Sequence, residues 1–501
     1  MARKSNDVKQ KVFYNYGKVR STCSQILAVL IGNVIMLQFG MSISISTVVN
    51  GELMSSNRNS TQTFRLSSAE GSWYGSLVLI AHPVGSILSS YIQDRFGRKA
   101  CFTLVALPEF IGWLCLYFAN SSLLLYASST CLGIALGLSE APILTYIGES
   151  MEPRLRSGLS SFTVFCSMIG LFTTFAVTSV YSWRQTALIY SSLPIFVFIV
   201  TIFIIPESPV WLLSKHKTKE ATKALCWLRG FTSENSVRDE LEYMVEFAKR
   251  RMEDQDTLTV KRKGGCLNSL QNLINILKEK SVFHSFIMFS LVFFICTISA
   301  MLPAKPYYRN IMDKIGLDGL SFNSREALVY SGAGTLIGAF LNMFTVKYIG
   351  KRRLLITSIL ISTGCQFVLG LFAMGYLKSV VKSAWLPFIL FCTVSFIAGY
   401  GITPIPWILL GEIFPMKSRG ILSGVTAALN SIVAFLLTIT YWNVVDITSL
   451  PWTIIIHATV GIVGIPYIFY NMPDTENKTL QQIQNDLEKN TVKQEEAEFS
   501  Q

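Results

Sequence analysis

Apolar stretches of about twenty residues alternate with shorter polar stretches along almost the whole chain. A helix needs about twenty apolar residues to cross the hydrocarbon core of a bilayer, so each stretch is long enough to do so. The pattern predicts twelve spans, which begin near Thr22, Gly71, Ala100, Leu123, Gly158, Gln185, Val282, Glu326, Leu354, Trp385, Ile421 and Pro451. We therefore expect an all-α polytopic membrane protein.

Polar segments at both ends and in the middle of the chain divide the spans into two groups of six. In the middle segment, the spacing of apolar residues predicts short amphipathic helices over Lys219–Leu228 and Val237–Arg251. The expected organisation is a tail at 1–21, a six-helix bundle at 22–205, a helical linker at 206–280, a second six-helix bundle at 281–471 and a tail at 472–501.

The composition agrees with a membrane protein, because 51% of the residues are apolar and 15% are charged. Soluble domains carry about 25% charged residues. A net charge of +12 would suggest a nucleic-acid partner in a soluble protein, but here the basic residues fall between apolar stretches, where topology explains them and no nucleic acid is expected. The ten cysteines form no CxxC pair and the four histidines are dispersed, so we expect no disulfide scaffold and no metal site.

The distribution of basic residues predicts the orientation of the chain. Of the 43 Lys and Arg residues, 34 lie on the side that carries both tails and the linker. Loops rich in Lys and Arg stay in the cytoplasm. We therefore expect both termini and the linker to be cytoplasmic.

Charged motifs recur in the two halves at the ends of corresponding spans. The matched motifs are DRFGRK at Asp94–Lys99 with GKRR at Gly350–Arg353, and the pair Glu149 and Arg156 with the pair Glu412 and Arg419. Parallel repeats of this kind are typical of transporters in which two halves alternate around a site near the middle of the membrane.

The tenth span contains an unusual sequence, Pro404–Gly420, in which two prolines and Trp407 precede Glu412 and Arg419. Prolines break a membrane helix, and the freed backbone is tolerated only where it lines protein or a cavity. The flat, amphipathic ring of Trp407 suits the face of a sugar. An ordinary kinked span with an interfacial tryptophan is the alternative.

Together these motifs resemble those of the sugar porters of the major facilitator superfamily, and the resemblance covers nearly the whole chain. Two further matches are PESP at Pro206–Pro209 and a degenerate PDT at Pro473. The YIGE sequence at Tyr146–Glu149 is most similar to insect facilitated trehalose transporters. The resemblance implies the major facilitator fold, with twelve transmembrane helices in two parallel-repeat bundles, and facilitated sugar diffusion by alternating access.

The resemblance also implies a network of charges that holds the cytoplasmic side shut in the outward-open state. Arginines at helix ends bridge carboxylates and helix C-terminal carbonyls on neighbouring helices. The alternative is positive-inside charge with no switching role. The expected members of this network are Asp94, Arg95, Arg98, Glu149, Arg156, Glu207, Glu412 and Arg419.

The chain departs from the family at the sugar site. Positions that carry amides, an arginine or an acidic residue in the family align with Val164, Cys296, Thr297, Leu302, Ser129 and Lys347, and PESPR ends in Val210. An unpaired buried hydroxyl costs about 1–3 kcal/mol, so either other polar residues bind the sugar or the substrate is less hydroxylated. The remaining candidates are Trp407, Thr403, Asn430, Thr297 and Ser299, with Tyr307 as an outer gate. A packing tryptophan, an interhelical hydrogen bond from Asn430 and an interfacial Tyr307 are the alternatives.

Ionisable residues inside the spans indicate a further possibility. Glu109 in the third span and Glu140 in the fourth should face protein or a water-filled path. His82 in the second span is a further residue that could carry protons. Glu109 and Glu140 are candidates for a proton path, but a structural role is the alternative. The first span holds no acidic residue, whereas family proton symporters carry an aspartate there. This difference favours uniport.

We therefore expect a facilitative transporter of trehalose or a hexose in the plasma membrane, with no catalytic activity and no cofactor. It would act as a monomer in the lipid bilayer, with a small sugar as its partner. A non-sugar solute carrier, a proton-coupled sugar symporter and a non-transporting sugar sensor are the alternatives. The sequon at Asn59 lies in the first outer loop and predicts glycosylation there.

Overall fold

The computed structural model describes residues 17–54, 64–242, 244–245, 280–315, 323–376, 385–414 and 419–473. Regular secondary structure in these ranges is entirely helical. Twelve spans in them are long and apolar enough to cross a membrane, which confirms the predicted number. The sequon residue Asn59 lies outside the described residues.

The first half consists of six spans, the last of which is divided into two helices. Capping residues mark several of the helix starts: Ser67 accepts from the backbone N–H of Glu70, whose carboxylate accepts from the Ser67 N–H in return. The spans are α2 (Lys18–Leu53), α3 (Ser68–Phe96), α4 (Arg98–Tyr117), α5 (Ser122–Ser150), α6 (Pro153–Val180), and α7 (Trp183–Tyr190) with α8 (Ser192–Phe203).

The second half repeats this arrangement, with two spans interrupted. The seventh span breaks at Met301, which has φ of 50°, and the tenth passes through a short π-helix just before Pro404. The spans are α13 (Lys280–Ser299) with η1 (Leu302–Tyr307) and α14 (Tyr308–Ile315), α15 (Ser324–Ile349), α16 (Lys351–Ala373), α17 (Trp385–Ile397) with η2 (Ala398–Ile402) and α18 (Pro404–Ile413), α19 (Arg419–Thr448), and α20 (Leu450–Asn471). The break predicted at the prolines is therefore present, and it begins one turn before Pro404.

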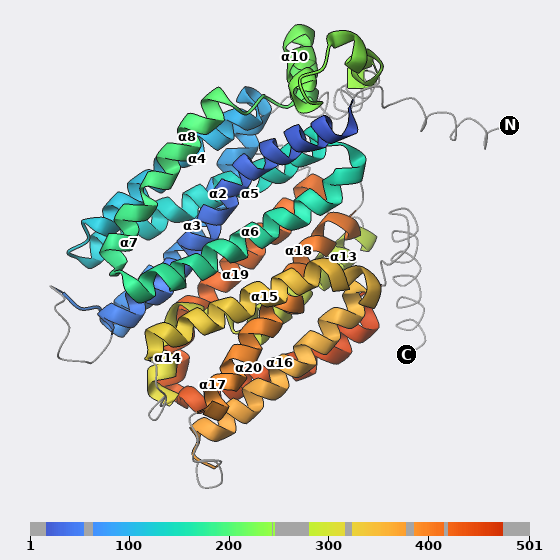
Figure 1. Ribbon diagram of the computed structural model, residues 1–501. Coiled ribbons are helices and arrows are strands. Elements are labelled where there is room, and N and C mark those ends of the chain that lie inside the picture. Colours follow the sequence, from blue (N-terminus) through green and yellow to red (C-terminus); the bar gives the residue numbers. More distant parts are fainter. Residues whose placement is uncertain are drawn as a thin grey trace.

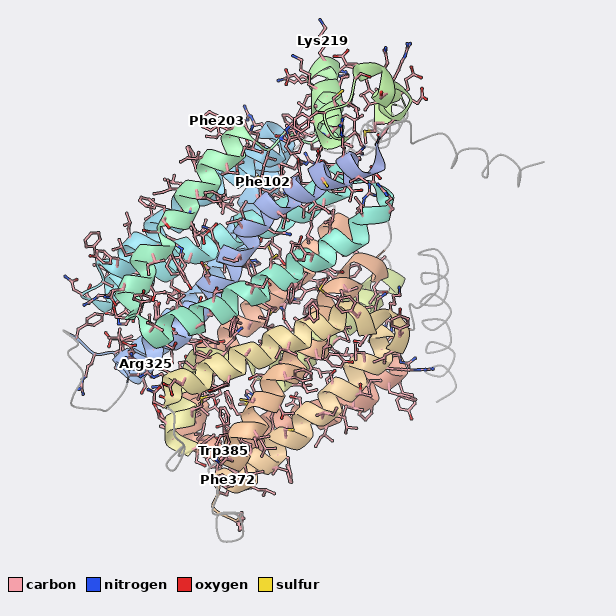
Figure 2. All side chains as sticks on the ribbon, viewed as in Figure 1. Phe102, Phe203, Lys219, Arg325, Phe372 and Trp385 are labelled. Atoms are coloured by element: carbon pink, nitrogen blue, oxygen red, sulfur yellow. The ribbon has the colours of Figure 1, made fainter. Side chains whose placement is uncertain are left out.

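The helices form two bundles that lie side by side (Figure 1). In the first bundle α3 and α4 pack on α5, and α2 packs on α6; in the second, α16 packs on α20 and α17 packs on α15 and α16. The bundles meet where α3 packs on α19 and where α6 packs on α15. Large apolar side chains cover the outside, as Phe203 on α8 shows (Figure 2), which fits a surface in contact with lipid.

Glycines at matching positions of the two halves support the repeat read from the sequence. Gly97 separates α3 from α4 with φ of 98°, and Gly350 separates α15 from α16 with φ of 89°. Both angles lie in the region that side chains with a Cβ rarely adopt. The DRFGRK and GKRR motifs therefore form the same kind of turn.

The linker continues from α8 through α9 (Pro209–Ser214) and α10 (Thr218–Leu228), which lie beyond one end of the first bundle (Figure 1). The helix expected at Lys219–Leu228 is thus confirmed. The guanidinium of Arg229 is buried, contacts Glu240 at 2.6 Å and donates to the Ser150 carbonyl at 3.3 Å. This contact fixes the linker against the end of α5. Of the second expected helix, Val237–Arg251, the eight described residues at 237–242 and 244–245 are helical, and the other seven lie outside the described residues.

Candidate functional site

The molecule has two ends, which we name by the elements that they contain. The linker end contains the C-terminal end of α5 and the linker helices. The opposite end contains the end of α2 at Leu53 and the start of α15 at Ser324. The predicted charge network belongs to the linker end, whereas the predicted sugar site lies between the two ends.

Three residues of the predicted charge network meet at the linker end, namely Arg98, Glu149 and Glu207. Arg98 Nη2 lies 2.7 Å from Glu149 Oε1, joining α4 to α5. The other carboxylate oxygen of Glu149 accepts a hydrogen bond of 2.7 Å from Ser208 Oγ. Arg98 Nη1 also donates to the Gln93 carbonyl near the end of α3. The first bundle is thus tied to the start of the linker by charged groups.

Glu207 lies at the N-terminus of α4 and takes part in the same cluster. It accepts hydrogen bonds from the backbone N–H groups of Arg98 and Lys99 at 3.0 and 3.1 Å. A carboxylate is favoured here because unpaired N–H groups and the helix dipole meet at a helix start. Burial nevertheless raises the pKa of Glu207, although these backbone hydrogen bonds act in the opposite direction. A Cβ on Gly97 would lie 2.1 Å from this carboxylate, so glycine makes room for it.

Other members of the predicted network lie apart from this cluster. Arg95 donates to the hydroxyl of Tyr91 at 2.7 Å. Asp94 contributes its backbone carbonyl, which accepts from the indole of Trp211 at 3.3 Å. Arg156 donates to the carbonyl of Met151 at 3.2 Å. The side chains of the second-half pair, Glu412 and Arg419, lie outside the described residues.

The opposite end holds an ion-pair cluster that joins the two halves. Glu52, at the end of α2, lies 2.9 Å from Arg325 Nη2 and 3.5 Å from Arg309 Nη1. Both arginines belong to the second half, and Figure 2 shows Arg325 at the start of α15, close to the end of α2. We call these three residues the clasp. Sequence reasoning missed it, because no motif links Glu52 to arginines more than 250 residues away.

Polar and aromatic contacts around Tyr307 close the same end. Tyr307 is fully buried, donates to the Thr438 carbonyl at 3.1 Å and stacks on Tyr441 with ring centres 5.4 Å apart. Thr47 of α2 donates to the carbonyl of Lys305 at 2.9 Å. The expected gate residue Tyr307 therefore lies in a closed region where helices of both halves meet.

Two sets of polar side-chain contacts lie in the middle of the molecule, and they are connected only through adjacent residues of α19. Thr297 of α13 donates to Asn430 Oδ1 at 3.1 Å. The next residue, Ser431, lies 3.2 Å from His82 Nδ1 on α3. The other ring nitrogen of His82 lies 3.2 Å from Glu140 Oε2 on α5. We call these five residues the polar chain.

The polar chain unites two predicted sugar-site residues, Thr297 and Asn430, with the predicted proton-path residue Glu140. His82 was expected either to carry protons or to have a structural role, and Ser431 was not predicted. Sequence position gives the height of each residue along its helix, but not the direction in which it points. An intramembrane serine next to Asn430 was the available signal for Ser431.

The other predicted sugar-site residues, Trp407, Thr403 and Ser299, belong to the seventh and tenth spans. Trp407 of α18 is half-buried, and its ring meets Phe293 edge-on with ring centres 5.3 Å apart. Thr403 is also half-buried and donates its N–H to the Ala398 carbonyl at 2.9 Å, which forms the π-type turn. Ser299 is buried, and its Oγ has no hydrogen-bond partner among the described residues.

Glu109 differs from Glu140 in its surroundings. Its side chain is buried and accepts a hydrogen bond of 3.2 Å from Ser42 Oγ of α2. It therefore links two helices of the first bundle. The described residues hold no group of three or more His, Cys, Asp or Glu side chains placed to bind a metal ion.

Comparisons with known proteins agree with this architecture. Residues 25–487 match a family described as "Sugar (and other) transporter". The facilitated trehalose transporter Tret1 of Apis mellifera ligustica is 28% identical over 466 residues, which cover 92% of this chain and 87% of that protein. Tret1 of Bombyx mori is 28% identical over 428 residues, which cover 84% of this chain and 80% of that protein.

Two solved structures share the fold. The inward-open conformation of the xylose transporter XylE from E. coli has a TM-score of 0.69 at 17% identity, covering 91% of this chain and 98% of that chain. XylE bound to 6-bromo-6-deoxy-D-glucose, described as a proton:xylose symporter of the major facilitator superfamily, has a TM-score of 0.66 at 17% identity, covering 92% and 99%. At this identity the likeness concerns the fold alone.

Proposed function

Because the chain belongs to the sugar transporter family and has the fold of the major facilitator superfamily, we propose that it carries trehalose or a hexose across the plasma membrane by facilitated diffusion. The polar chain is the observation that carries this proposal. It places hydrogen-bonding groups from both bundles at the middle of the membrane-spanning helices. A solute bound there would be reached from either side by rocking one bundle against the other.

The contacts at the two ends support an alternating mechanism. The clasp and the region around Tyr307 join the halves at the opposite end, so the structure is closed there. To open this end, the ion pairs between Glu52 and its two arginines must separate. At the linker end, the cluster of Arg98, Glu149 and Glu207 joins the first bundle to the start of the linker, and its proposed partners in the second half would be Glu412 and Arg419.

We assign the linker end to the cytoplasm, because most Lys and Arg residues lie on that side. The opposite end would then face the outside of the cell, and the clasp would close the outer entrance. Trp407 would contact the sugar ring with its apolar face, with Asn430 and Thr297 supplying hydrogen bonds and Thr403 and Ser299 lining the broken helices. The trehalose transporters among the relatives favour this function over a non-sugar carrier or a sensor.

Uptake measurements in oocytes test the proposal directly. Labelled trehalose and D-glucose should each be offered over a range of concentrations, with surface expression measured by biotinylation. We expect saturable uptake of at least one sugar, and we expect Trp407→Ala to lower it by about tenfold because an aromatic contact is lost. Binding without flux, or no interaction with either sugar, would contradict facilitated sugar transport.

A further inference from the structure

We propose that Glu140, positioned by His82, is a solute-binding residue whose carboxylate accepts hydrogen bonds from two adjacent hydroxyl groups of the sugar. This inference rests on the proposed function and deepens it. Val164 and Leu302 stand where the family carries amides, and neither has a side chain that can hydrogen-bond a sugar. Glu140 would supply a hydrogen-bonding group in their place.

The height of Glu140 along its helix suits a central site. Glu140 precedes Glu149 at the linker end by nine residues, which corresponds to about 13 Å at 1.5 Å per helical residue. Ser431 follows the start of α19 at Arg419 by twelve residues, or about 18 Å. The hydrocarbon core is about 30 Å thick, so both residues lie near its middle.

Glu140 is also connected to the other predicted sugar-site residues. His82 contacts Glu140 through one ring nitrogen and Ser431 of the second bundle through the other, each at 3.2 Å. The neighbour of Ser431 is Asn430, which accepts from Thr297. Ser431 contacts His82 and its neighbour Asn430 contacts Thr297, so the same turn of α19 carries contacts to both bundles.

The surroundings of the carboxylate indicate that it faces water or a solute. The side chain of Glu140 is 21% exposed, whereas Glu109, the other carboxylate at mid-membrane height, is a buried link between helices. An ionised side chain that faced lipid at this depth would cost several kcal/mol. The exposed surface of Glu140 thus belongs to a water-filled path, and its Oε1 accepts no hydrogen bond from the described residues.

The chemistry of a carboxylate matches a pair of hydroxyls. It has about four lone-pair sites, and its hydrogen bonds to neutral donors are stronger than those of an amide because the acceptor is charged. Only one of its oxygens contacts His82. Because both nitrogens of the His82 ring have partners, the ring is held in one orientation, and His82 fixes the direction of the carboxylate.

A deoxy-sugar series tests this assignment. Uptake of labelled glucose or trehalose, whichever is transported, should be measured with 2-, 3-, 4- and 6-deoxyglucose as competitors. In the wild type we expect at least one analogue to bind about tenfold more weakly than glucose, because a buried acceptor loses its donor. In Glu140→Ala the KM for sugar uptake should rise about tenfold. The affinity for that analogue should then lie within about twofold of the affinity for glucose.

Controls separate binding from a structural role. Glu220→Gln removes the same charge from an exposed residue of α10, and it should leave KM and the analogue pattern unchanged. His82→Asn should raise KM and leave the analogue penalty partly in place, because the carboxylate remains. If Glu140→Ala does not reach the surface, Glu140→Gln replaces it. The affinities for glucose and the deoxy analogues are then compared through the shift in melting temperature that each sugar produces in the purified protein.

Two results would overturn the inference in different ways. If the wild type and the Glu140 variants show the same analogue penalties, Glu140 does not bind the hydroxyls, although the sugar-transport proposal stands. If the wild type neither transports nor binds glucose or trehalose, the proposed function itself fails, and the inference fails with it.

Discussion

The clasp predicts how a single substitution should redistribute the protein between its conformations. Glu52 of the first half is almost fully buried beside Arg309 and Arg325, which both belong to the second half. In the proposed alternating mechanism, these ion pairs break when the opposite end opens. Glu52→Gln should therefore favour the conformation that is open at this end.

The size of the effect follows from the burial of the three side chains. Breaking a fully buried ion pair costs about 3–5 kcal/mol, whereas an exposed pair contributes about 0.2–1 kcal/mol. The side chain of Glu52 is 4% exposed and that of Arg325 is 40% exposed, so we take a value between these limits, about 2 kcal/mol. This corresponds to a shift of about thirtyfold in the conformational equilibrium.

Cysteine labelling measures this shift. Ser72 of α3 is buried near Tyr307 at the closed end, and Ser72→Cys should react with a membrane-impermeant thiol reagent only when this end opens. We expect Glu52→Gln to raise the labelling rate of Ser72→Cys by about thirtyfold. Glu326→Gln, an exposed change at the same end that preserves the helix cap, should have no effect. Equal labelling rates of Ser72→Cys with and without the Glu52→Gln substitution would refute the reasoning.

Two further predictions concern buried carboxylates. Glu207→Ala should destabilise the purified protein by about 1–3 kcal/mol, because the N–H groups of Arg98 and Lys99 lose their acceptor, while Glu207→Gln should cost less. Because burial raises the pKa of Glu207, the native state binds this proton more tightly than the unfolded state. Its contribution to stability should be largest at low pH and decline as the pH rises through the native pKa; a melting temperature with the same pH dependence in wild type and Glu207→Gln would contradict this. Because Glu109 is buried and bonded to Ser42, sugar uptake into proteoliposomes should not respond to an imposed pH gradient, and accumulation driven by such a gradient would establish proton coupling.

The sequence predicted the features that depend on pattern along one chain. Hydrophobic stretches gave the twelve spans, because each span must match the thickness of a bilayer. The repeated motifs identified the turns at Gly97 and Gly350, where a positive φ is required in both halves. Arg98 and Glu149 were expected in one charge network, since both lie at helix ends on the same side, but their direct pairing was seen only in the structure.

Features that depend on contacts between distant helices were not predicted. The contact between His82 and Ser431 depends on which faces of α3 and α19 point toward each other. The sequence does not give these orientations, because hydrophobic periodicity is weak in helices that are apolar on most faces. The clasp joins Glu52 to Arg325 across the two halves, and neither residue belongs to a recognised motif. The proposed substrate site therefore rests on side-chain contacts.

The central claim is that a single mid-membrane site alternates between the two sides, and counterflow in proteoliposomes tests it most directly. Vesicles containing the purified protein would be loaded with unlabelled sugar, and the entry of labelled trehalose or glucose would be followed. The account predicts a transient accumulation of label above its external concentration, because a loaded carrier returns with sugar from the inside. Flux that rises linearly with concentration and shows no such overshoot would contradict it.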